Sequence, residues 1–138
     1  MPVRYLLDTN IISDLMRRPD GPIAGRIAEV GEASIGTSIV VAGELRYGAE
    51  KAGSRKLTER VDLLLSAIEI LPLEPPGDQC YAEIRHKLTR EGVPIGPNDL
   101  LIAAHAVAMD LTLVTANTRE FERVPSLQLE NWLSPLIG

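Results

Sequence analysis

Three carboxylates occupy positions where apolar segments end or begin. Asp8 follows the apolar stretch YLL, Glu44 lies in the second turn of an expected helix, and Asp99 precedes the apolar run LLIAAHAVAM. Taken singly, Asp8 could cap a helix and Asp99 could gain about 0.3–1 kcal/mol from a helix dipole, while Glu44 could pair with Arg46 or water. If the three converge on one cleft, however, their mutual repulsion calls for a divalent cation.

The available ligand atoms decide which metal such a cleft would favour. An all-oxygen set of ligands favours Mg²⁺, or Mn²⁺ as an alternative, over zinc. We interpret His86 as a solvated residue and His105 as a core or interface residue, because neither is placed for a shared site. Cys80 is the one cysteine, which excludes an intramolecular disulfide and a multi-cysteine zinc site. Its expected role is that of a small, packed hydrophobe.

Magnesium in an acidic cleft predicts phosphodiester hydrolysis, because the ion activates water and stabilises charge on the phosphate. We expect Asp8 and Asp99 to hold the metal directly or through its waters. Glu44 would orient or deprotonate the attacking water, and it is also a candidate metal ligand. Hydroxyl and amide side chains nearby would orient these carboxylates. The candidates for this supporting role are Thr9, Asn10, Thr115 and Asn117.

The elements that must position these residues alternate along the chain. Hydrophobic spacing predicts strands over 3–7, 33–37, 69–73 and 111–118, with a further edge strand over 127–132. It predicts helices over 10–18, 23–31, 39–53, 55–68 and 78–92, and an almost wholly apolar helix within 93–110. This alternation indicates a three-layer α/β/α domain with a central, mainly parallel sheet. In such sheets, ligands bind beyond the carboxyl ends of the strands.

Length and charge restrict the class of protein. The 138 residues fit one domain, which we expect to span residues 1–138. A net charge of −5 argues against capture of nucleic acid by bulk electrostatics, although local basic clusters could contact phosphates. No apolar run approaches the roughly 20 residues that a bilayer requires. We therefore expect a cytoplasmic protein without a membrane segment. The alternative is that these basic clusters are simply solvated helix surface. The clusters are Arg17 with Arg18, Arg46 with Lys51, and Arg55, Lys56 and Arg60.

Four blocks of sequence carry a family resemblance. LLDTNIISDLM, SIVVAGELRYGAEK, PIGPNDLLIAAHA and LVTANTREFERV together resemble PIN-domain ribonucleases, specifically the VapC-type toxins of toxin–antitoxin pairs. The resemblance implies a PIN fold, magnesium-dependent endonucleolytic cleavage of RNA, growth arrest by the free toxin and inhibition by a VapB-type antitoxin. It carries over Asp8, Glu44 and Asp99 as the acidic site, with metal contact from Asp8 and Asp99.

The resemblance also implies an assembly and one departure from the family pattern. The resemblance implies a homodimer that joins antitoxin dimers in larger complexes on promoter DNA, where the antitoxin makes the DNA contacts. Many PIN domains place a fourth aspartate after the fourth strand, whereas this chain has Asn117 there. We expect Asn117 to be a site residue, with Glu120 a candidate metal ligand and substitute for the missing acid. The uncharged Asn117 therefore gives less support for a tightly bound second metal ion.

Other readings of the carboxylates are open. A haloacid-dehalogenase-like phosphatase needs a second acid two residues after the first, where this chain has Asn10. A response-regulator receiver needs a late lysine, and the last one here is Lys87. The GxSxG, HExxH, GxxxxGK[ST] and GxGxxG signatures are missing. A non-enzymatic alternative is a catalytically weak PIN-like protein whose acidic pocket accepts an arginine from a partner.

Partner binding has a separate signal in the sequence. The helices expected over 10–18 and 55–68 carry more aliphatic residues than a small sheet would cover. We expect a groove for an antitoxin segment or for a second copy of the chain, with complete burial in the core as the alternative. Trp132 is interpreted as an edge-strand packing residue.

Overall fold

The computed structural model describes residues 2–133, which form a five-stranded sheet with helices on both sides. The strand order is β3-β2-β1-β4-β5, and every neighbouring pair is parallel. The strands are β1 (Tyr5–Leu7), β2 (Ile35–Ser38), β3 (Glu69–Leu71), β4 (Thr112–Val114) and β5 (Gln128–Glu130). The helices are α1 (Thr9–Arg17), α2 (Pro22–Val30), α3 (Ile39–Ala52), α4 (Arg55–Ala67), α5 (Gly77–Arg90), α6 (Pro97–Met109) and α7 (Thr118–Phe121), with a 3-10 turn at Glu32–Ser34.

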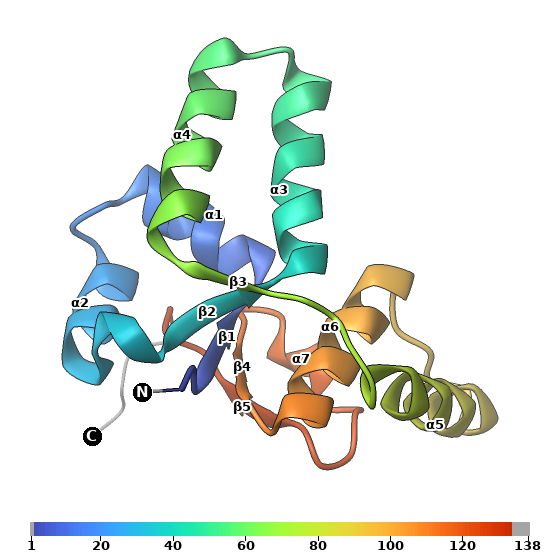
Figure 1. Cartoon of the computed structure of the whole chain (residues 1–138). Coiled ribbons are helices and arrows are strands. Elements are labelled where there is room, and N and C mark those ends of the chain that lie inside the picture. The colour runs from blue at the N-terminus through green and yellow to red at the C-terminus, as the bar shows by residue number, and fades with distance from the viewer. Residues whose placement is uncertain (1, 134–138) are drawn as a thin grey trace.

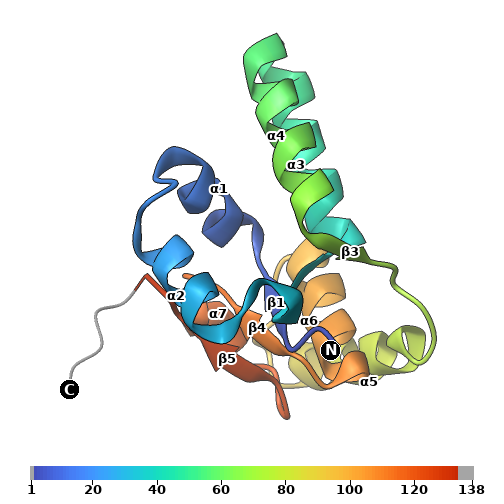
Figure 2. The same ribbon diagram turned by 60° about the vertical axis from the view of Figure 1, so that its left-hand side comes forward.

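The strand order explains the three layers. From β1 the chain proceeds through β2 to β3 in one direction, and it then crosses back to β4 and β5 on the other side of β1. Because crossovers between parallel strands are right-handed, a reversal of direction moves the connecting helices to the opposite face. Figures 1 and 2 show the sheet between α1 and α2 on one side and α5 and α6 on the other, with the α3–α4 hairpin projecting away from it. The predicted α/β/α class is confirmed.

The core surrounds the two central strands. Leu6 and Leu7 of β1 and Leu113 and Val114 of β4 are fully buried, as expected for parallel strands covered on both faces. The apolar segment predicted within 93–110 forms α6, which contributes Ile102 to this core. None of the helices that the structure describes combines the length and hydropathy needed to span a bilayer.

Local signals placed several element boundaries correctly. Ser38 caps α3, since its hydroxyl accepts a hydrogen bond of 3.1 Å from the Val40 N–H. Gly31 follows the last residue of α2 with a φ of 94°, a conformation that glycine adopts at little cost. The expected edge strand is present as β5, which pairs only with β4 among the described strands. Trp132 packs beside it, with its ring 5.2 Å from that of Tyr5.

The strand predicted over 111–118 is too long. β4 ends at Val114, and Thr118 begins the short helix α7. The Thr115 N–H still bonds to the Glu130 carbonyl of β5, but the Asn117 N–H instead bonds to the Thr115 hydroxyl at 3.0 Å, which turns the chain toward α7. Such local side-chain bonds compete with a sheet ladder. Phe121, which is fully buried, anchors α7 against the core.

Candidate active site

The register of β1 and β4 places Asp8 beside Thr115. Leu7 pairs with Val114, so the next residue of each strand extends from the same edge of the sheet. The Thr115 hydroxyl donates a hydrogen bond of 2.8 Å to Asp8 Oδ2, and the Thr9 N–H donates one of 2.8 Å to Oδ1. Asp8 is therefore the N-cap of α1 and also a buried carboxylate at the switch point of the sheet, where open α/β folds bind ligands.

Glu44 reaches the same region from the second turn of α3. The Thr9 hydroxyl donates a hydrogen bond of 2.5 Å to Glu44 Oε1, and the Asn98 amide donates one of 3.3 Å to Oε2. The alternative pairing of Glu44 with Arg46 is wrong, because Arg46 forms its ion pair with Asp62 of α4. Glu44 is thus held toward β1 and α6 by neutral donors.

Asp99 and Glu120 form a pair at the start of α6. Asp99 lies in the first turn of that helix, and its carboxyl group shares a hydrogen bond with Glu120. Glu120 is anchored from two other directions: its Oε1 accepts a hydrogen bond of 2.9 Å from the Gly96 N–H, and its Oε2 accepts one of 2.7 Å from the Asn117 amide. Asn117 thus acts as a donor that holds the neighbouring acid in place.

These side chains surround a cavity of about 450 Å³. All four residues predicted as catalytic contribute to its walls, so the structure brings together positions as far apart in the sequence as Asp8 and Asn117. Glu120 contacts Asp99 without lining the cavity itself. The lining residues are Asp8, Thr9, Asn10, Ser13, Arg17, Glu44, Asp99 and Asn117.

The crowding of carboxylates shifts their pKa values. Burial raises the pKa of Asp8, although the hydrogen bonds from Thr115 and Thr9 oppose the shift. Burial, the hydrogen bond to Glu120 and the charges of the neighbouring acids raise the pKa of Asp99 to about 7. The protonated form of Asp99 is therefore substantially populated near neutral pH.

Glu120 responds in the opposite direction. Burial alone would raise its pKa, but hydrogen bonds from Gly96, Asn117 and the Asp99 carboxyl group outweigh that effect and lower it. The opposite directions of the two pKa shifts favour a state in which Asp99 carries a proton and Glu120 accepts its hydrogen bond, which lowers the repulsion between the two carboxyl groups. A proton between two carboxylates occupies the role that a bound cation would take.

The chemistry of the cavity suits a hard cation. Its walls offer carboxylate, hydroxyl and amide oxygens, the ligands that magnesium and manganese prefer. Within residues 2–133, no set of three or more acidic, histidine or cysteine side chains is already arranged to hold an ion. The carboxylates instead accept hydrogen bonds from protein donors, as with Thr115 on Asp8 and Thr9 on Glu44.

Neither histidine is among the residues that line this cavity. His86 is exposed on α5. His105 is buried in α6, with its Nδ1 atom 2.8 Å from the Ser38 hydroxyl. Burial lowers the pKa of His105, which favours its neutral form. Neither residue supplies a ligand to the cavity.

Sequence reasoning missed three contributors to the site. Asn98 holds Glu44, while Ser13 and Arg17 line the cavity. A signal for the last two was present, because Asn10, Ser13 and Arg17 have the spacing of one helix face. Asn10 supports the site as an acceptor, since its Oδ1 atom binds the Ala116 N–H at 3.1 Å.

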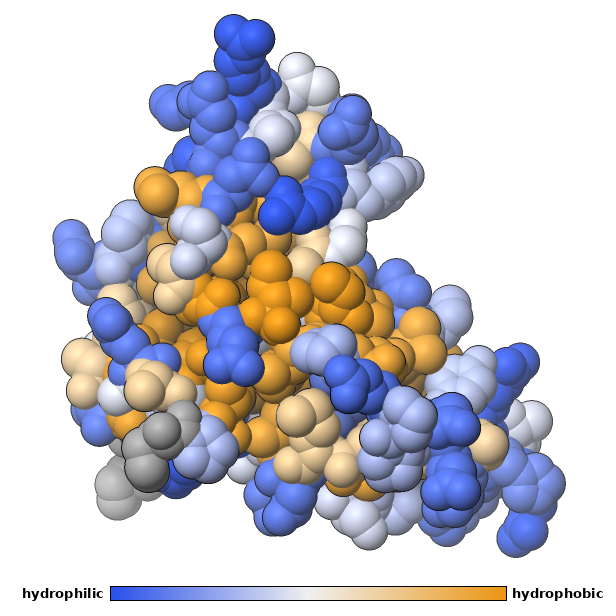
Figure 3. Space-filling model, viewed as in Figure 1, coloured by the Kyte–Doolittle hydropathy of each residue, from blue (hydrophilic) through white to orange (hydrophobic). Residues whose placement is uncertain are grey.

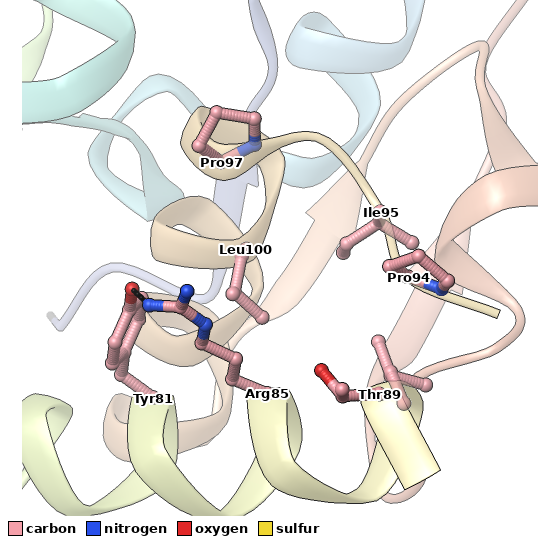
Figure 4. Close-up of a pocket in the computed structure, with 8 residues that line it drawn as sticks. Tyr81, Arg85, Thr89, Pro94, Ile95, Pro97 and Leu100 are labelled. Atoms are coloured by element: carbon pink, nitrogen blue, oxygen red, sulfur yellow. Dashed lines mark hydrogen bonds between the residues drawn. The ribbon is translucent and has the colours of Figure 1, made fainter. Parts of the chain in front are cut away.

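A second cavity, of about 280 Å³, lies between α5 and α6. Figure 4 shows Tyr81 and Arg85 on one side of it, where the Arg85 guanidinium donates a hydrogen bond of 2.8 Å to the Tyr81 hydroxyl. Pro94, Ile95 and further apolar residues form much of the remaining wall. None of its lining residues is acidic, so it lacks the ligands for metal-dependent chemistry.

Comparison with known proteins identifies the family. Residues 5–127 match the PIN domain. The chain is 39% identical over 130 residues to ribonuclease VapC2 of Rickettsia felis, covering 93% of this chain and 97% of the relative. It is 35% identical over 134 residues to the tRNA(fMet)-specific endonuclease VapC of Shigella flexneri, covering 94% and 98%.

A solved structure extends this similarity to three dimensions. The chain matches a protein in the crystal structure of VapBC2 from Rickettsia felis bound to a promoter DNA fragment, with a TM-score of 0.86 and 37% identity. The match covers 96% of this chain and 99% of that one. By sequence and by fold, the chain belongs to the PIN-domain family, within the VapC ribonucleases.

Proposed function

We propose that this VapC-type protein is a magnesium-dependent endoribonuclease, the toxin of a toxin–antitoxin pair, with manganese as an alternative ion. Its substrate is RNA, and its reaction is hydrolysis of a phosphodiester bond. The observation that carries the proposal is the cavity at the end of β1, where Asp8, Glu44 and Asp99 lie together despite their repulsion. Such an arrangement costs stability and is explained by a need for metal-dependent chemistry.

The roles of the residues follow from their surroundings. Asp8 and Asp99 are the proposed metal ligands, since each is a crowded carboxylate whose raised pKa a cation would reverse. A bound magnesium ion supplies Lewis-acid chemistry, which stabilises charge on the phosphate and makes water easier to deprotonate. Glu44 orients the attacking water and accepts its proton, while Thr9 and Asn98 fix the direction of the carboxylate.

Glu120 is the proposed substitute for the missing fourth aspartate. It contacts Asp99 directly, and Asn117 and the Gly96 N–H hold its carboxylate in place. With a cation bound beside Asp99 in place of the proton, Glu120 would either bind that ion or orient Asp99 through waters bound to the ion. Asn117 is then a positioning residue for Glu120.

Cleavage of a structured RNA with and without magnesium tests the nuclease. The parent protein should cut only with the metal. Asp8→Asn or Asp99→Asn should reduce the rate by at least about a hundredfold, because loss of a residue that merely supports a metal ligand already costs about 10- to 100-fold. Asp62→Asn is the matched control, because Asp62 lies on α4 and pairs with Arg46 outside the cavity. Cutting that needs no metal, or that survives both substitutions, would favour a partner-binding protein with an acidic pocket.

We propose a VapB-type antitoxin as the partner, docked on α1, α2 and α4. An apolar groove of about 420 Å³ between α1 and α4 includes Leu15, Met16 and Leu63 in its walls. A neighbouring hollow of about 290 Å³ adds Ile27 of α2. Figure 3 shows hydrophobic residues gathered below the α3–α4 hairpin, from the lower part of α4 to the β3 edge of the sheet. The groove supports the partner surface expected from the two aliphatic helices.

The proposed assembly is a toxin homodimer joined to the antitoxin. The similar protein from Rickettsia felis was solved as a VapBC2 complex on promoter DNA. For this chain, a net charge of −5 favours an arrangement in which the antitoxin makes the DNA contacts. Light scattering on the isolated chain tests the homodimer, which a strictly monomeric mass would exclude.

A further inference from the structure

We propose that Arg17 binds a backbone phosphate of the RNA strand beside the one that is cleaved. The inference rests on the proposed nuclease function and extends it to substrate binding. Arg17 is the one basic residue among the eight that line the acidic cavity in the described part of the chain. Phosphate is the substrate group that a guanidinium recognises best, because two of its N–H groups can bind two phosphate oxygens together.

The position of Arg17 on α1 gives the cavity a direction. Asn10, Ser13 and Arg17 recur at intervals of three and four residues, so they share one face of the helix and all three line the cavity. With a rise of 1.5 Å per residue, Arg17 lies about 12 Å along the helix axis from Thr9, at the far end of this polar stripe. A strand whose scissile phosphate lies near Asp8 would therefore run along α1 toward Arg17.

The contacts of Asp14 explain why Arg17 is available for a ligand. The Arg18 guanidinium donates two hydrogen bonds to the Asp14 carboxylate, from Nε to Oδ1 at 3.2 Å and from Nη2 to Oδ2 at 2.6 Å. Arg17 reaches the same carboxylate only at 3.5 Å, and its side chain is 71% exposed. Asp14 thus keeps Arg17 near the cavity mouth without consuming its hydrogen-bonding capacity.

The positive charge of Arg17 offsets repulsion between the acidic cavity and the RNA backbone. The cavity presents Asp8, Glu44 and Asp99 to a substrate that is itself a chain of anions. A metal ion compensates the charge only where it is bound, whereas a flanking phosphate still faces the acidic wall. A single arginine at the end of the stripe offsets that repulsion and fixes the register of the strand.

Two substitutions at this position and one elsewhere test the inference in the full-length protein. Arg17→Gln removes the charge, Arg17→Lys keeps it without the planar fork, and Arg55→Gln makes the same charge change at the tip of the α3–α4 hairpin. The first measurement is the affinity for a single-stranded RNA oligonucleotide in EDTA, over a series of salt concentrations. The second is the separate effect on kcat and KM with magnesium. Thermal unfolding checks that each variant is folded.

Arg17→Gln should weaken RNA binding about tenfold, raise KM more than it lowers kcat, and flatten the plot of log affinity against log salt by about 0.7, the slope of one single-strand phosphate contact. Arg17→Lys should retain the salt slope with part of the affinity, and Arg55→Gln should match the parent. If Arg17→Gln and Arg55→Gln bind alike, or if only kcat changes, the inference is wrong. Because binding is measured without metal, a parent that binds RNA but never cuts it would overturn the nuclease proposal alone.

Discussion

Thr115 donates a hydrogen bond of 2.8 Å to Asp8 across a sequence separation of 107 residues. The contact exists because β1 and β4 are adjacent and in register, so the first residue beyond each strand meets the other. Thr115 is fully buried, so its hydroxyl meets Asp8 out of contact with bulk solvent. The relationship makes Thr115 the residue that aims the Asp8 carboxylate.

Replacing Thr115 with valine should weaken the metal site while preserving the volume of the side chain. Loss of the donor leaves Asp8 less oriented and more easily protonated, and loss of a supporting hydrogen bond lowers metal affinity by about 10- to 100-fold. The magnesium concentration for half-maximal cleavage measures this change. Thr115→Ser keeps the hydroxyl and should resemble the parent. A valine variant with unchanged magnesium dependence would show that Thr115 has no part in the site.

Replacing Asp99 with asparagine should stabilise the metal-free protein at neutral pH. The pKa of Asp99 is raised from 3.8 to about 7 by burial and by its acidic neighbours. The folded state therefore holds this proton more tightly than the unfolded state. The stability that protonation of Asp99 adds is fully present below about pH 4 and is lost as the pH rises to about 7.

The stabilisation by Asp99→Asn should thus be small near pH 4.5 and reach on the order of 1 kcal/mol near pH 8. Urea unfolding in EDTA at both pH values measures the difference, with Asp62→Asn as the control for removal of an exposed charge. Magnesium should reduce the difference, because a cation favours the charged form of the parent. A difference that did not depend on pH would contradict the proposed crowding.

Replacing Asn117 with aspartate tests its role as a donor to Glu120. The Asn117 amide lies 2.7 Å from Glu120 Oε2, so an aspartate would place a second anion at hydrogen-bonding distance. We expect a loss of about 1–2 kcal/mol in the free energy of unfolding without metal, partly restored by magnesium. Asn131→Asp is a matched control, because Asn131 uses its Oδ1 atom to accept a bond from the Leu133 N–H. Equal stability of the two variants in EDTA would argue against this role.

Replacing Leu63 with aspartate tests the partner groove. The side chain belongs to the groove between α1 and α4, and the residue is 73% exposed, so the isolated protein should remain folded and active. Binding of a VapB-type antitoxin, measured by calorimetry, should weaken at least about tenfold because a charge enters an apolar contact. Lys56→Gln makes the same change in net charge near the start of α4, outside the groove, and should bind normally. An aspartate variant that binds as the parent does would move the interface elsewhere.

Much of the framework followed from the sequence alone. Alternating apolar and amphipathic segments are local signals, so they predicted the elements and the α/β class. The positions of Asp8 after a strand, Glu44 in the second turn of a helix and Asp99 before an apolar run could be recognised for the same reason. So was the order of the motifs that resemble PIN-domain proteins.

The partners of the site residues depended on the tertiary structure. Arg46 pairs with Asp62 rather than Glu44, Asp99 meets Glu120, and Arg17 lines the cavity. Each of these relationships joins separate elements or depends on how the helices pack. Strand order and helix packing decide which of several nearby donors reaches a given carboxylate, and no local pattern encodes that choice. The sequence therefore determined which residues could do chemistry, and the fold decided which of them meet.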